Sequence, residues 1–509
     1  MNRILRILRS RYLWAALCIV LEFSQLLAVF IFFYNFFLPF AVLAWIFHVC
    51  VLLYIINRDE IPELKLPWII LLFLLPVLGA FVFILLSSTE SSKKEALRYD
   101  AAKQALRPYM QQTHALESLR QQSMDAYAQA NYLFHTAGMP CHGSTQTTYF
   151  AVGEDFHAAL LKDLREAREF ILMEYFIVQE GEMWDPIHAI LREKAASGVE
   201  VCLMYDDFGC MTTLPERYDV QLRSEGIRCM SFNRFTPTLS HIHNNRDHRK
   251  ITVIDGAIGY TGGINLADEY INARVRFGHW KDTAVRLEGD AVRNLTALFV
   301  TNWNMQSREP LDGMRYFRGT EKAAQHTGYV IPFGDGPRPL YPEDIGKCVY
   351  LNMIHAAKEY LYITTPYLIC DRELMNALRM AAQKGVDVRL ITPHIPDKKA
   401  VFLMTRSNYR PLLEAGVQIY EYTPGFIHAK NFVCDDQFAV CGTINLDYRS
   451  LVHHFECAAW MCGVSCIPDM KADFLQTIAK SEKITLEKAT LKLWQRLPAE
   501  IMKILSPLL

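Results

Sequence analysis

Apolar residues are unevenly distributed along the chain, and its N-terminal part holds three long runs of them, at 12–34, 36–56 and 66–89. The first run is interrupted by a glutamate, a serine and a glutamine, whereas the third has no ionisable residue. Because about 20 apolar residues cross a bilayer as a helix, we expect transmembrane helices within 36–87. The segment 1–35 is expected to be a basic N-terminus followed by a run that either spans the membrane or lies in its interface.

Basic residues flank this apolar region on both sides. The positive-inside rule favours the cytoplasm for both clusters, and that requires an even number of crossings. Two spans with an interfacial first run satisfy the requirement, so we expect the remainder of the chain on the cytoplasmic side. The clusters are Arg3, Arg6, Arg9 and Arg11 before the first run, and Lys93, Lys94, Arg98, Lys103 and Arg107 after the last.

Beyond the apolar region, 88–130 is polar, rich in alanine and glutamine, and nearly free of glycine. This composition predicts a helical tether that is broken at Pro108. From 131 onwards, short apolar runs alternate with helical patterns, as is typical of α/β domains. The last segment, 481–509, is amphipathic and is expected either to lie on a bilayer or to pack on a domain.

The α/β part repeats itself. The stretch "LREKAASGVEVCLMY" at 191–205 resembles "LRMAAQKGVDVRLIT" at 378–392, and "LRSEGIRCM" is similar to "LLEAGVQIY". In each stretch a helical pattern ends near a glycine and leads into a β-branched run. Self-similarity on this scale indicates a duplicated domain, which divides this part into lobe one, 131–325, and lobe two, 326–480.

A polar motif recurs at the same place in both halves, as "HRKITVID" and "HAKNFVCD", each followed by a glycine and an asparagine. Residues i and i+2 of a strand share a face, so the histidine and lysine of each copy are expected to project together. We assign both motifs to the catalytic set, with their aspartates supporting the strand ends. The members are His248, Lys250, Asp255 and Asn265 in the first copy, and His428, Lys430, Asp435 and Asn445 in the second.

Paired histidines, lysines and asparagines suit displacement at a phosphoryl group. One imidazole attacks phosphorus while the other protonates the leaving oxygen. The lysines and asparagines hold the non-bridging oxygens. A histidine-rich metal site is the competing interpretation, but the i+2 neighbour of each histidine is a lysine, which is a poor ligand beside a cation. We therefore expect neither a metal nor a cofactor.

Charge and cysteine content argue against a nucleic-acid partner, a disulfide framework and a zinc site. The formal net charge is −1, with 53 basic and 54 acidic residues, so no basic field favours nucleic acid as a partner. The 13 cysteines are odd in number and scattered, which is not typical of a disulfide framework or a zinc site. We interpret them as small buried side chains in a reducing compartment.

These motifs resemble those of the phospholipase D superfamily. Most of the chain, roughly residues 50–509, is similar to the bacterial cardiolipin synthase family within it. The supporting stretches include "GGINLADEY" at 262–270, "HWKDTAVRLEG" at 279–289 and "GTINLDYRS" at 442–450. The resemblance implies two phospholipase D-type lobes, each a mixed sheet flanked by helices, whose motifs form one site. Family members often carry serine where this chain has Gly263 and Thr443.

The resemblance also implies roles for individual residues. His248 is the expected nucleophile of a phosphohistidine intermediate and His428 the acid and then the base, although the pseudo-symmetric motifs allow the reverse. Asp282 and Glu456 are the expected partners that orient the histidines. Lys250, Lys430, Asn265 and Asn445 are the expected phosphate ligands.

The expected reaction converts two phosphatidylglycerol molecules into cardiolipin and glycerol in the inner membrane of a bacterium. Three other functions remain open: a phospholipase D that transfers the group to water, a nuclease of the same superfamily, and a scaffold with an inactive site. The apolar runs and neutral charge disfavour the nuclease, and the intact motifs disfavour the scaffold. The sequence also leaves open whether the chain forms a homo-oligomer.

Overall fold

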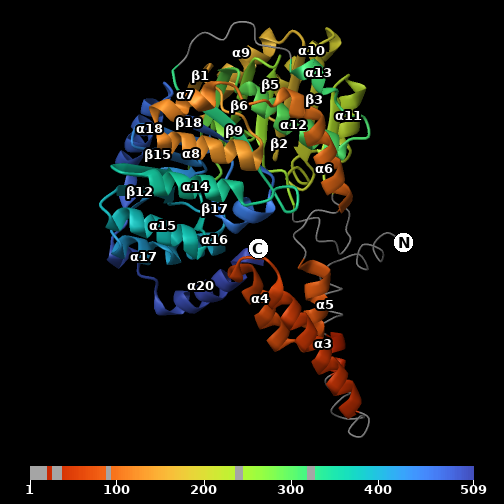
Figure 1. Ribbon diagram of the computed structural model, residues 1–509, viewed down its shortest axis with the longest axis vertical. Coiled ribbons are helices and arrows are strands. Elements are labelled where there is room, and N and C mark those ends of the chain that lie inside the picture. Colours follow the sequence, from red (N-terminus) through yellow and green to blue (C-terminus); the bar gives the residue numbers. More distant parts are fainter. Residues whose placement is uncertain (1–19, 26–36, 88–92, 235–244, 318–326, 509) are drawn as a thin grey trace. The chain divides into compact units, whose positions relative to one another are not determined.

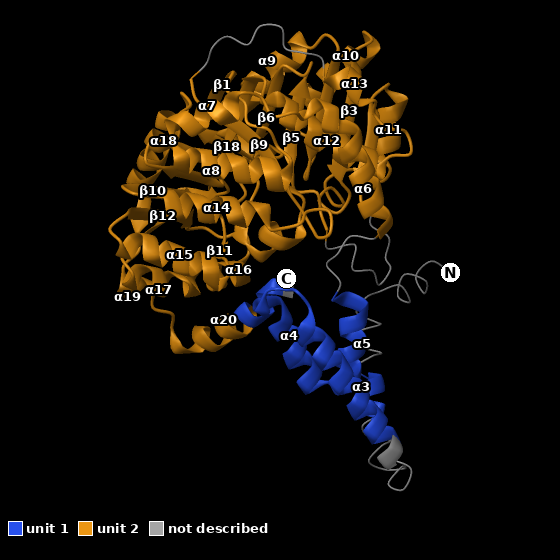
Figure 2. Ribbon diagram, viewed as in Figure 1, with its two compact units in different colours: residues 1–89, 235–243, 503–509 blue, residues 90–234, 244–502 orange. Residues whose placement is uncertain are grey.

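The computed structural model describes residues 20–25, 37–87, 93–234, 245–317 and 327–508, which fold into two compact units. The first unit comprises 1–89, 235–243 and 503–509, and the second comprises 90–234 and 244–502 (Figure 2). Both copies of the sequence motif belong to the second unit. Most of the expected N-terminal segment, 1–35, lies outside the described residues.

The first unit contains three apolar helices, α3 (Phe37–Asn57), α4 (Pro62–Leu74) and α5 (Pro76–Leu86). Among the described helices, α3 alone has the length and composition of a membrane span. The single span expected over 66–89 is instead divided between α4 and α5. The break falls at Leu75, whose φ of −136° and ψ of 78° are not helical, because a residue before proline is disfavoured in the helical region.

The second unit begins with α6 (Lys93–Leu106), α7 (Ala115–Gln122) and α8 (Met124–Tyr132). The tether expected at 88–130 is therefore largely helical, but its helices are packed rather than free. Tyr99 is buried against the ring of Tyr341, at 5.6 Å between centroids. The indole Nε1 of Trp460 donates a 3.0 Å hydrogen bond to Gln129.

Two mixed sheets form the body of this unit (Figure 1). Their strands follow the same order. The first sheet is β1 (Thr145–Phe150), β8 (Ala284–Gly289), β6 (Ile258–Gly262), β5 (Lys250–Ile254), β2 (Phe170–Tyr175), β3 (Glu200–Asp206) and β4 (Arg228–Phe232). The second is β9 (Tyr329–Asp335), β18 (Glu456–Cys462), β16 (Phe438–Gly442), β15 (Asn431–Cys434), β10 (Tyr360–Thr364), β12 (Asp387–Pro393), β13 (Gln418–Tyr422) and β19 (Ser481–Lys483). The shared order is what a duplicated domain produces, and β19 extends the second sheet just past residue 480.

Helices flank both sheets, and those of the repeated stretches end near glycines, as the sequence predicts. Gly198 follows α10 and Gly385 follows α15, with φ of 92° and 100°, the left-handed conformation that stops a helix at little cost for glycine. In lobe one the helices are α9 (Gly153–Glu166), α10 (Trp184–Ala196), α11 (Tyr218–Ser224), α12 (Val292–Gln306) and α13 (Gly313–Tyr316). In lobe two they are α14 (Ile345–Ala356), α15 (Arg372–Gln383), α16 (Lys399–Ser407), α17 (Tyr409–Glu414) and α18 (Ile467–Ala479).

Both faces of the central strands are buried. In β2, Phe170 and Leu172 belong to the core that the two lobes share, whereas Ile171 and Met173 belong to a second core on the other face. This alternation follows from the two-residue period of a strand. Because the shared core joins both lobes, the two sheets hold each other in place around the motifs.

The C-terminal segment forms α19 (Leu486–Ala489) and α20 (Leu493–Leu505). Several apolar side chains of α20 are exposed, at positions about four residues apart, so the helix is amphipathic as expected. They are Leu493, Trp494, Leu497, Ile501 and Leu505.

Candidate active site

Both copies of the motif occupy the same place in their lobes, at the start of a central strand. His248 and Lys250 lie at the start of β5, and His428 and Lys430 directly precede β15. Each histidine is 8% exposed and both lysines are almost fully buried. Burial lowers the pKa of each histidine, and the charge of the other lobe's lysine lowers it further. The two strand ends therefore face one common site.

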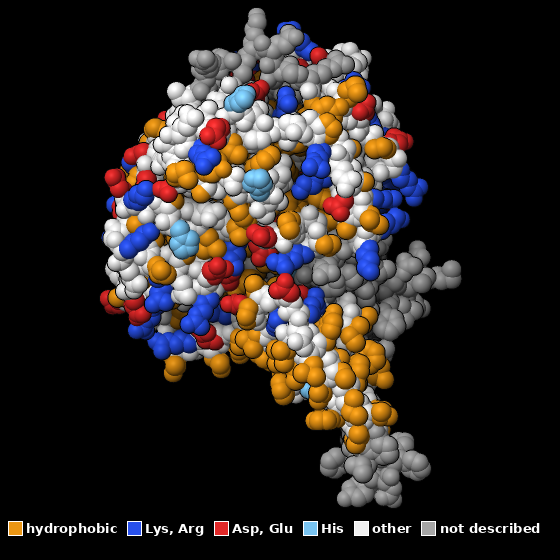
Figure 3. Space-filling model, viewed as in Figure 1, with side chains coloured by type: hydrophobic (Ala, Val, Ile, Leu, Met, Phe, Trp, Pro, Cys, Tyr) orange, Lys and Arg blue, Asp and Glu red, His pale blue; other side chains and the backbone are white. Residues whose placement is uncertain are grey.

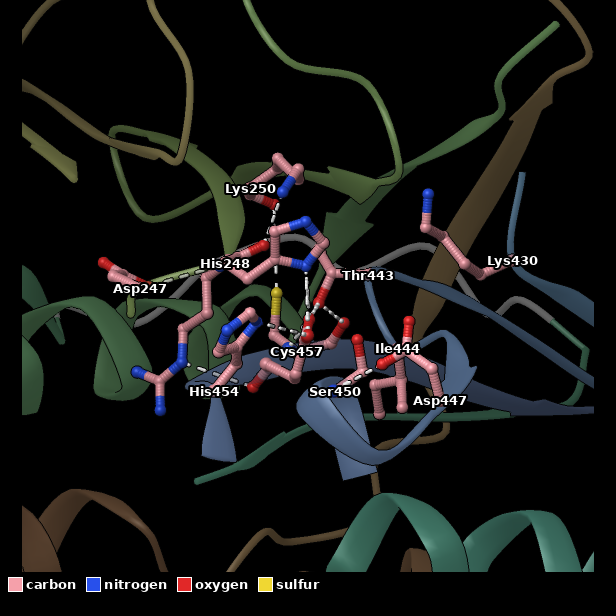
Figure 4. Close-up of polar contacts among 12 residues, drawn as sticks. Asp247, His248, Lys250, Lys430, Thr443, Ile444, Asp447, Ser450, His454 and Cys457 are labelled. Carbon is pink, nitrogen blue, oxygen red and sulfur yellow. Dashed lines mark hydrogen bonds and ion pairs between the residues drawn. The ribbon is translucent and has the colours of Figure 1, made fainter. Parts of the chain in front are cut away.

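His248 is held by a carboxylate from lobe two. Its Nδ1 lies 3.0 Å from both carboxylate oxygens of Glu456, which begins β18 and is fully buried. The hydroxyl of Thr443 donates a hydrogen bond to the same carboxylate (Figure 4). With Nδ1 occupied, Nε2 is the ring nitrogen available to a substrate.

His428 is held in the corresponding way by a carboxylate from lobe one. Its Nδ1 lies 2.6 Å from Oδ2 of Asp282 and 2.8 Å from Nζ of Lys430. A Cβ at Gly263 would lie 2.1 Å from Oδ1 of Asp282, so a side chain there would displace the carboxylate. Gly263 in lobe one therefore provides no hydroxyl like that of Thr443 in lobe two, but it leaves space for the carboxylate of Asp282.

Backbone pairing between the lobes brings each carboxylate to the opposite histidine. The N–H of His248 donates to the carbonyl of Phe455 at 2.9 Å, and the N–H of His428 donates to that of Lys281 at 2.7 Å. The second contact continues the pairing of β14 (Gly425–Ile427) with β7 (His279–Lys281). Each histidine is thus hydrogen-bonded to the residue that precedes its carboxylate.

The structure therefore brings both sequence-predicted orienting residues, Asp282 and Glu456, to a histidine, and it exchanges them between lobes. Glu456 is closer in sequence to His428 but contacts His248, and Asp282 is closer to His248 but contacts His428. Spacing along the chain could not have indicated this exchange, because the contacts depend on how two distant segments pair.

The two lysines are buried cations beside the histidines. Burial lowers the pKa of Lys430 to about 7, and the positive charge of Lys250 adds to the effect against the attraction of Asp282. Burial also lowers the pKa of Lys250 to about 8, against the attraction of Glu456. Both lysines gain protons when an anion enters the site, because an opposite charge nearby favours the charged form.

The imidazoles are neutral in the free site. Burial and then the charge of Lys430 lower the pKa of His428 to about 4, while burial and the charge of Lys250 lower that of His248 well below its usual value. Burial opposes ionisation of Asp282, but His428 and Lys430 outweigh it and lower the pKa of that carboxyl. A neutral imidazole with a free Nε2 is a nucleophile, and a bound phosphate anion would favour its protonated form.

The two asparagines lie next to the site and are buried. Asn265 accepts a 3.0 Å hydrogen bond from the N–H of Ile177 and donates a 2.6 Å bond to the hydroxyl of Tyr270. The side-chain oxygen of Asn445 is buried and has no hydrogen-bond partner among the described residues. Asn265 is therefore fixed by the fold, whereas Asn445 retains bonding capacity that a ligand could use.

The structure does not bring Asp255 and Asp435 into the pocket, and their place in the catalytic set is corrected here to a structural role. Each lies at the far end of the motif strand with a positive φ, 52° and 53°. The carboxylate of Asp255 accepts hydrogen bonds from three consecutive backbone N–H groups at 168–170, and that of Asp435 accepts three at 358–360. They support the strand ends, as the sequence also suggested.

A buried polar network behind the first motif was not predicted from the sequence. Asn302 donates hydrogen bonds to Glu174 at 2.6 Å and to Asp247 at 3.2 Å, and Nε of Arg249 donates to the carbonyl of Glu456 at 3.3 Å. Burial raises the pKa of Asp247 and Glu174. The alternation along the strand could have indicated the position of Arg249, because it must face away from its motif neighbours.

His454 is a third imidazole at the site that the sequence did not single out. Its ring lies 5.7 Å from that of His248 (Figure 4). Ligand atoms of His248, His454 and Glu456 lie within 4.8 Å of one another, which is close enough to hold a metal ion. However, Nδ1 of His248 already contacts the carboxylate, and the nearby Lys250 disfavours a second cation.

Taken together, the site offers two imidazoles with free Nε2 atoms, each backed by a carboxylate, and two buried amines. This set can attack phosphorus, protonate a leaving oxygen and neutralise the non-bridging oxygens. The apparatus is assembled only when both lobes are present.

Comparisons with known proteins agree with this geometry. A family model described as "Cardiolipin synthase, PLD-like domain" matches residues 160–276 and 350–478. An uncharacterized protein of Streptococcus mutans is 41% identical and aligns over 90% of this chain and 99% of its own length. The cardiolipin synthase of Alkalihalophilus pseudofirmus is 32% identical, over 90% of this chain and 91% of its own.

A solved structure confirms the fold class. The crystal structure of a phosphatidylserine synthase from Haemophilus influenzae superposes with a TM-score of 0.55 at 13% identity, covering 75% of this chain and 98% of that one. The expected α/β fold of phospholipase D type, with mixed sheets, is therefore confirmed. The matched family model and the extent of the similarity to named relatives show that the chain belongs to the cardiolipin synthase family of phospholipase D-like proteins.

Proposed function

We propose that the protein transfers a phosphatidyl group from one phosphatidylglycerol to another, giving cardiolipin and glycerol. The observation that carries the proposal is the exchange of carboxylates, which leaves two neutral imidazoles facing one site beside two buried lysines. One phosphodiester replaces another, so the reaction needs no external energy source. Family membership supplies the choice of phosphatidylglycerol as the lipid.

In the first half-reaction, Nε2 of His248 attacks the phosphorus of the donor lipid. A P–N bond forms and the P–O bond to the headgroup glycerol breaks. His428 takes up a proton from the solvent when the anionic donor binds, and it gives this Nε2 proton to the glycerol oxygen. Glycerol leaves and a phosphatidyl–histidine remains, stabilised by Glu456 on the opposite nitrogen.

In the second half-reaction, the terminal hydroxyl of a second phosphatidylglycerol attacks the same phosphorus. Nε2 of His428, now neutral, takes the hydroxyl proton as a general base. The P–N bond breaks and its electron pair returns to His248. Cardiolipin leaves, His428 returns its proton to the solvent, and both imidazoles are again neutral.

The donor phosphate is held by cations and amides of both lobes. The positive charges of Lys250 and Lys430 stabilise the non-bridging oxygens, and the side-chain amide of Asn445 donates a hydrogen bond to the phosphate. Asn265 acts mainly by positioning, since both of its polar ends are bonded within the fold. We infer from the apolar helices of the first unit that these reactions occur at the bacterial cell membrane, and from the basic clusters that flank them that the lobes lie in the cytoplasm.

The decisive experiment gives the detergent-purified protein phosphatidylglycerol alone, with a chelator present. Cardiolipin and glycerol in equal amounts support phosphatidyl transfer at a metal-free site. Phosphatidic acid as the main product would instead make the protein a hydrolase. Loss of activity on chelation, restored by a divalent metal, would favour the histidine–glutamate metal site.

A second experiment identifies the nucleophile. H428A is incubated with lipid labelled in the phosphatidyl group, quenched at alkaline pH and digested for mass spectrometry. The label is expected on the peptide that contains His248 when the donor has a p-nitrophenol headgroup, because that headgroup leaves without an acid, whereas hydrolysis and transfer, which need His428 as the base, are slowed. Label on the peptide that contains His428 in H248A would reverse the two roles.

A further inference from the structure

Helices α4 and α5 pack against each other in an antiparallel arrangement. Trp68 and Phe83, about equally far from the break at Leu75, meet with ring centroids 5.5 Å apart. Closer to the break, a Cβ at Gly79 would lie 2.8 Å from the carbonyl oxygen of Leu71, so only glycine lets the two backbones approach this closely. The two helices therefore form a hairpin and do not continue one another.

The open end of this hairpin is polar and meets the end of α3. Arg58 follows α3; its guanidinium forms an ion pair with Glu60 at 2.6 Å and donates a 3.3 Å hydrogen bond to the hydroxyl of Ser87, just after α5. Lys65, near the start of α4, donates a 3.0 Å hydrogen bond to the carbonyl of Ile56. The hairpin thus begins and ends at the same end of α3.

The closed end of the hairpin reaches only the middle of α3. Phe73, next to the tip, packs on His48 with ring centroids 6.0 Å apart, and His48 lies near the centre of α3. At 1.5 Å per residue, the 13 residues of α4 are about 20 Å long, whereas the hydrocarbon core of a bilayer is about 30 Å thick. The hairpin is too short to cross, and its tip lies at the depth of the centre of α3.

The surface and the backbone of the hairpin both suit hydrocarbon. Exposed apolar side chains cover it, and Figure 3 shows hydrophobic side chains gathered over α3, α4 and α5. At the tip, the N–H of Leu75 bonds the carbonyl of Leu71 at 2.8 Å, that of Gly79 bonds the carbonyl of Leu75 at 2.6 Å, and Pro76 has no N–H. These two bonds satisfy the N–H groups of Leu75 and Gly79, and Pro76 has none to satisfy, which lowers the cost of placing the tip in lipid. The exposed side chains include Leu66, Phe73, Leu74, Phe81, Ile84 and Leu85.

We propose that α4 and α5 form a re-entrant hairpin that enters one leaflet and returns to the side from which it came, while α3 crosses the bilayer. The run at 66–89, which by composition alone predicts a span, is then not a crossing. The chain leaves the membrane on the side where α3 ends.

The proposal is tested by single cysteines in the full-length protein, labelled with a membrane-impermeant maleimide in right-side-out and inverted vesicles. D59C lies in the exposed link between α3 and α4, and K94C lies at the exposed start of α6. Peptide mass spectrometry reads each position separately from the native thiols. Labelling of both positions from the same side is expected; labelling from opposite sides would overturn the proposal.

The tip supplies an independent measurement. Leu74 is 72% exposed, so L74C is expected to resist the aqueous reagent from both sides and, once carrying a fluorophore, to be quenched by lipids with a nitroxide deep in the acyl chain. Labelling of L74C by the aqueous reagent from either side would overturn the proposal. V275C, on the catalytic unit, is a matched control that should label from the same side as K94C. None of these readouts depends on lipid transfer activity.

Discussion

Glu456 and Asp282 contact the two imidazoles from the opposite lobes, and their different surroundings suit the different roles proposed for the histidines. The Glu456 carboxylate takes Nδ1 of His248 with both oxygens and also accepts from Thr443. Asp282 shares Nδ1 of His428 with the amine of Lys430. In the proposed mechanism, the first arrangement suits a ring that carries a covalent group, and the second suits a ring that gains and loses a proton.

This difference predicts a selective rescue. A donor lipid with a p-nitrophenol headgroup needs no protonation of its leaving oxygen, so H428A and D282N should release p-nitrophenol at rates close to the unsubstituted enzyme. The same variants should lose roughly 10²–10⁴-fold with the glycerol headgroup, the range of general acid catalysis. H248A and E456Q should be impaired with both donors, measured as the initial rate of headgroup release.

The pairing is checked by combining substitutions. Because Glu456 acts through His248, E456Q should add little to the defect of H248A, whereas residues of independent function add their effects. If E456Q were silent in an H428A background and D282N silent in an H248A background, the carboxylates would belong to the histidines of their own lobes.

The lysines predict the alkaline limb of the pH profile. The free-enzyme pKa values of Lys430 and Lys250, lowered by burial to about 7 and about 8, imply that positive charge is lost as pH rises through this range. The kcat/KM for phosphatidylglycerol should therefore fall from neutral to moderately alkaline pH, while kcat falls later because the bound anion raises both pKa values. K430R, which stays charged, should move the limb of kcat/KM to higher pH.

At the scale of the element, the motif strands are anchored at the end remote from the chemistry. Asp435 accepts three backbone N–H bonds that hold the turn before β10, at 2.7–3.0 Å. Losing charge-assisted bonds of this kind costs about 1–3 kcal/mol. D435N, which tolerates the positive φ, should lower the unfolding temperature in detergent and leave kcat per folded molecule unchanged.

The neighbouring aspartate is the matched control. Asp436 shares the positive φ, but its carboxylate binds the partly exposed Lys471 and accepts a 3.0 Å hydrogen bond from the hydroxyl of Tyr360. The surface pair contributes little, and an asparagine oxygen can still accept from Tyr360. D436N should therefore leave the unfolding temperature nearly unchanged. A fall in kcat without a fall in stability for D435N would return this residue to the catalytic set.

The hairpin of the first unit depends on one small residue. G79L places a side chain against the backbone of Leu71 and Leu72, and overpacking of this kind costs about 1–3 kcal/mol. The variant should lose its folded fraction at a lower temperature when heated in detergent and resolved by size-exclusion chromatography. F81L, at an exposed position of the same helix, should behave like the unsubstituted protein.

The sequence predicted some of these elements better than others, for physical reasons. The motif strands and the glycine-ended helices follow from local periodicity and backbone preference, and the structure has them where the repeats indicate. The break at Pro76 was visible, but the uninterrupted apolar composition of 66–89 favoured a single span. Packing of Tyr99 and Gln129 into the catalytic unit depends on partners far away in the chain, which polar composition does not reveal.

At the scale of the whole molecule, the two lobes make one site and not two. If each motif worked alone, removing one histidine would leave about half of the activity. Because each half-reaction needs both imidazoles, H248A and H428A should each lower cardiolipin synthesis with the natural donor by at least about 10²-fold. Thin-layer separation of radiolabelled products measures this directly, and activity near one half in either variant would contradict a shared site.

Contacts between the lobes also determine which residues of the site could be predicted from the sequence. Two intact motifs at one constant offset identified the histidines, the lysines and the class of chemistry. The exchange of Glu456 and Asp282 depends on two backbone contacts between lobes, at Phe455 and Lys281, and no local pattern encodes them. His454 is one of many histidines until the fold places it beside His248.

The exchanged carboxylates also bear on the ancestry of the chain. Each half of the present protein carries one histidine and the carboxylate that contacts the histidine of the other half. A half-length ancestor could therefore have worked only where two copies met face to face. Fusion of two such genes would have preserved an existing site and freed its halves to diverge. Such divergence would explain why the two halves differ beside the site. One half combines Gly263 with the shorter Asp282, and the other combines Thr443 with the longer Glu456.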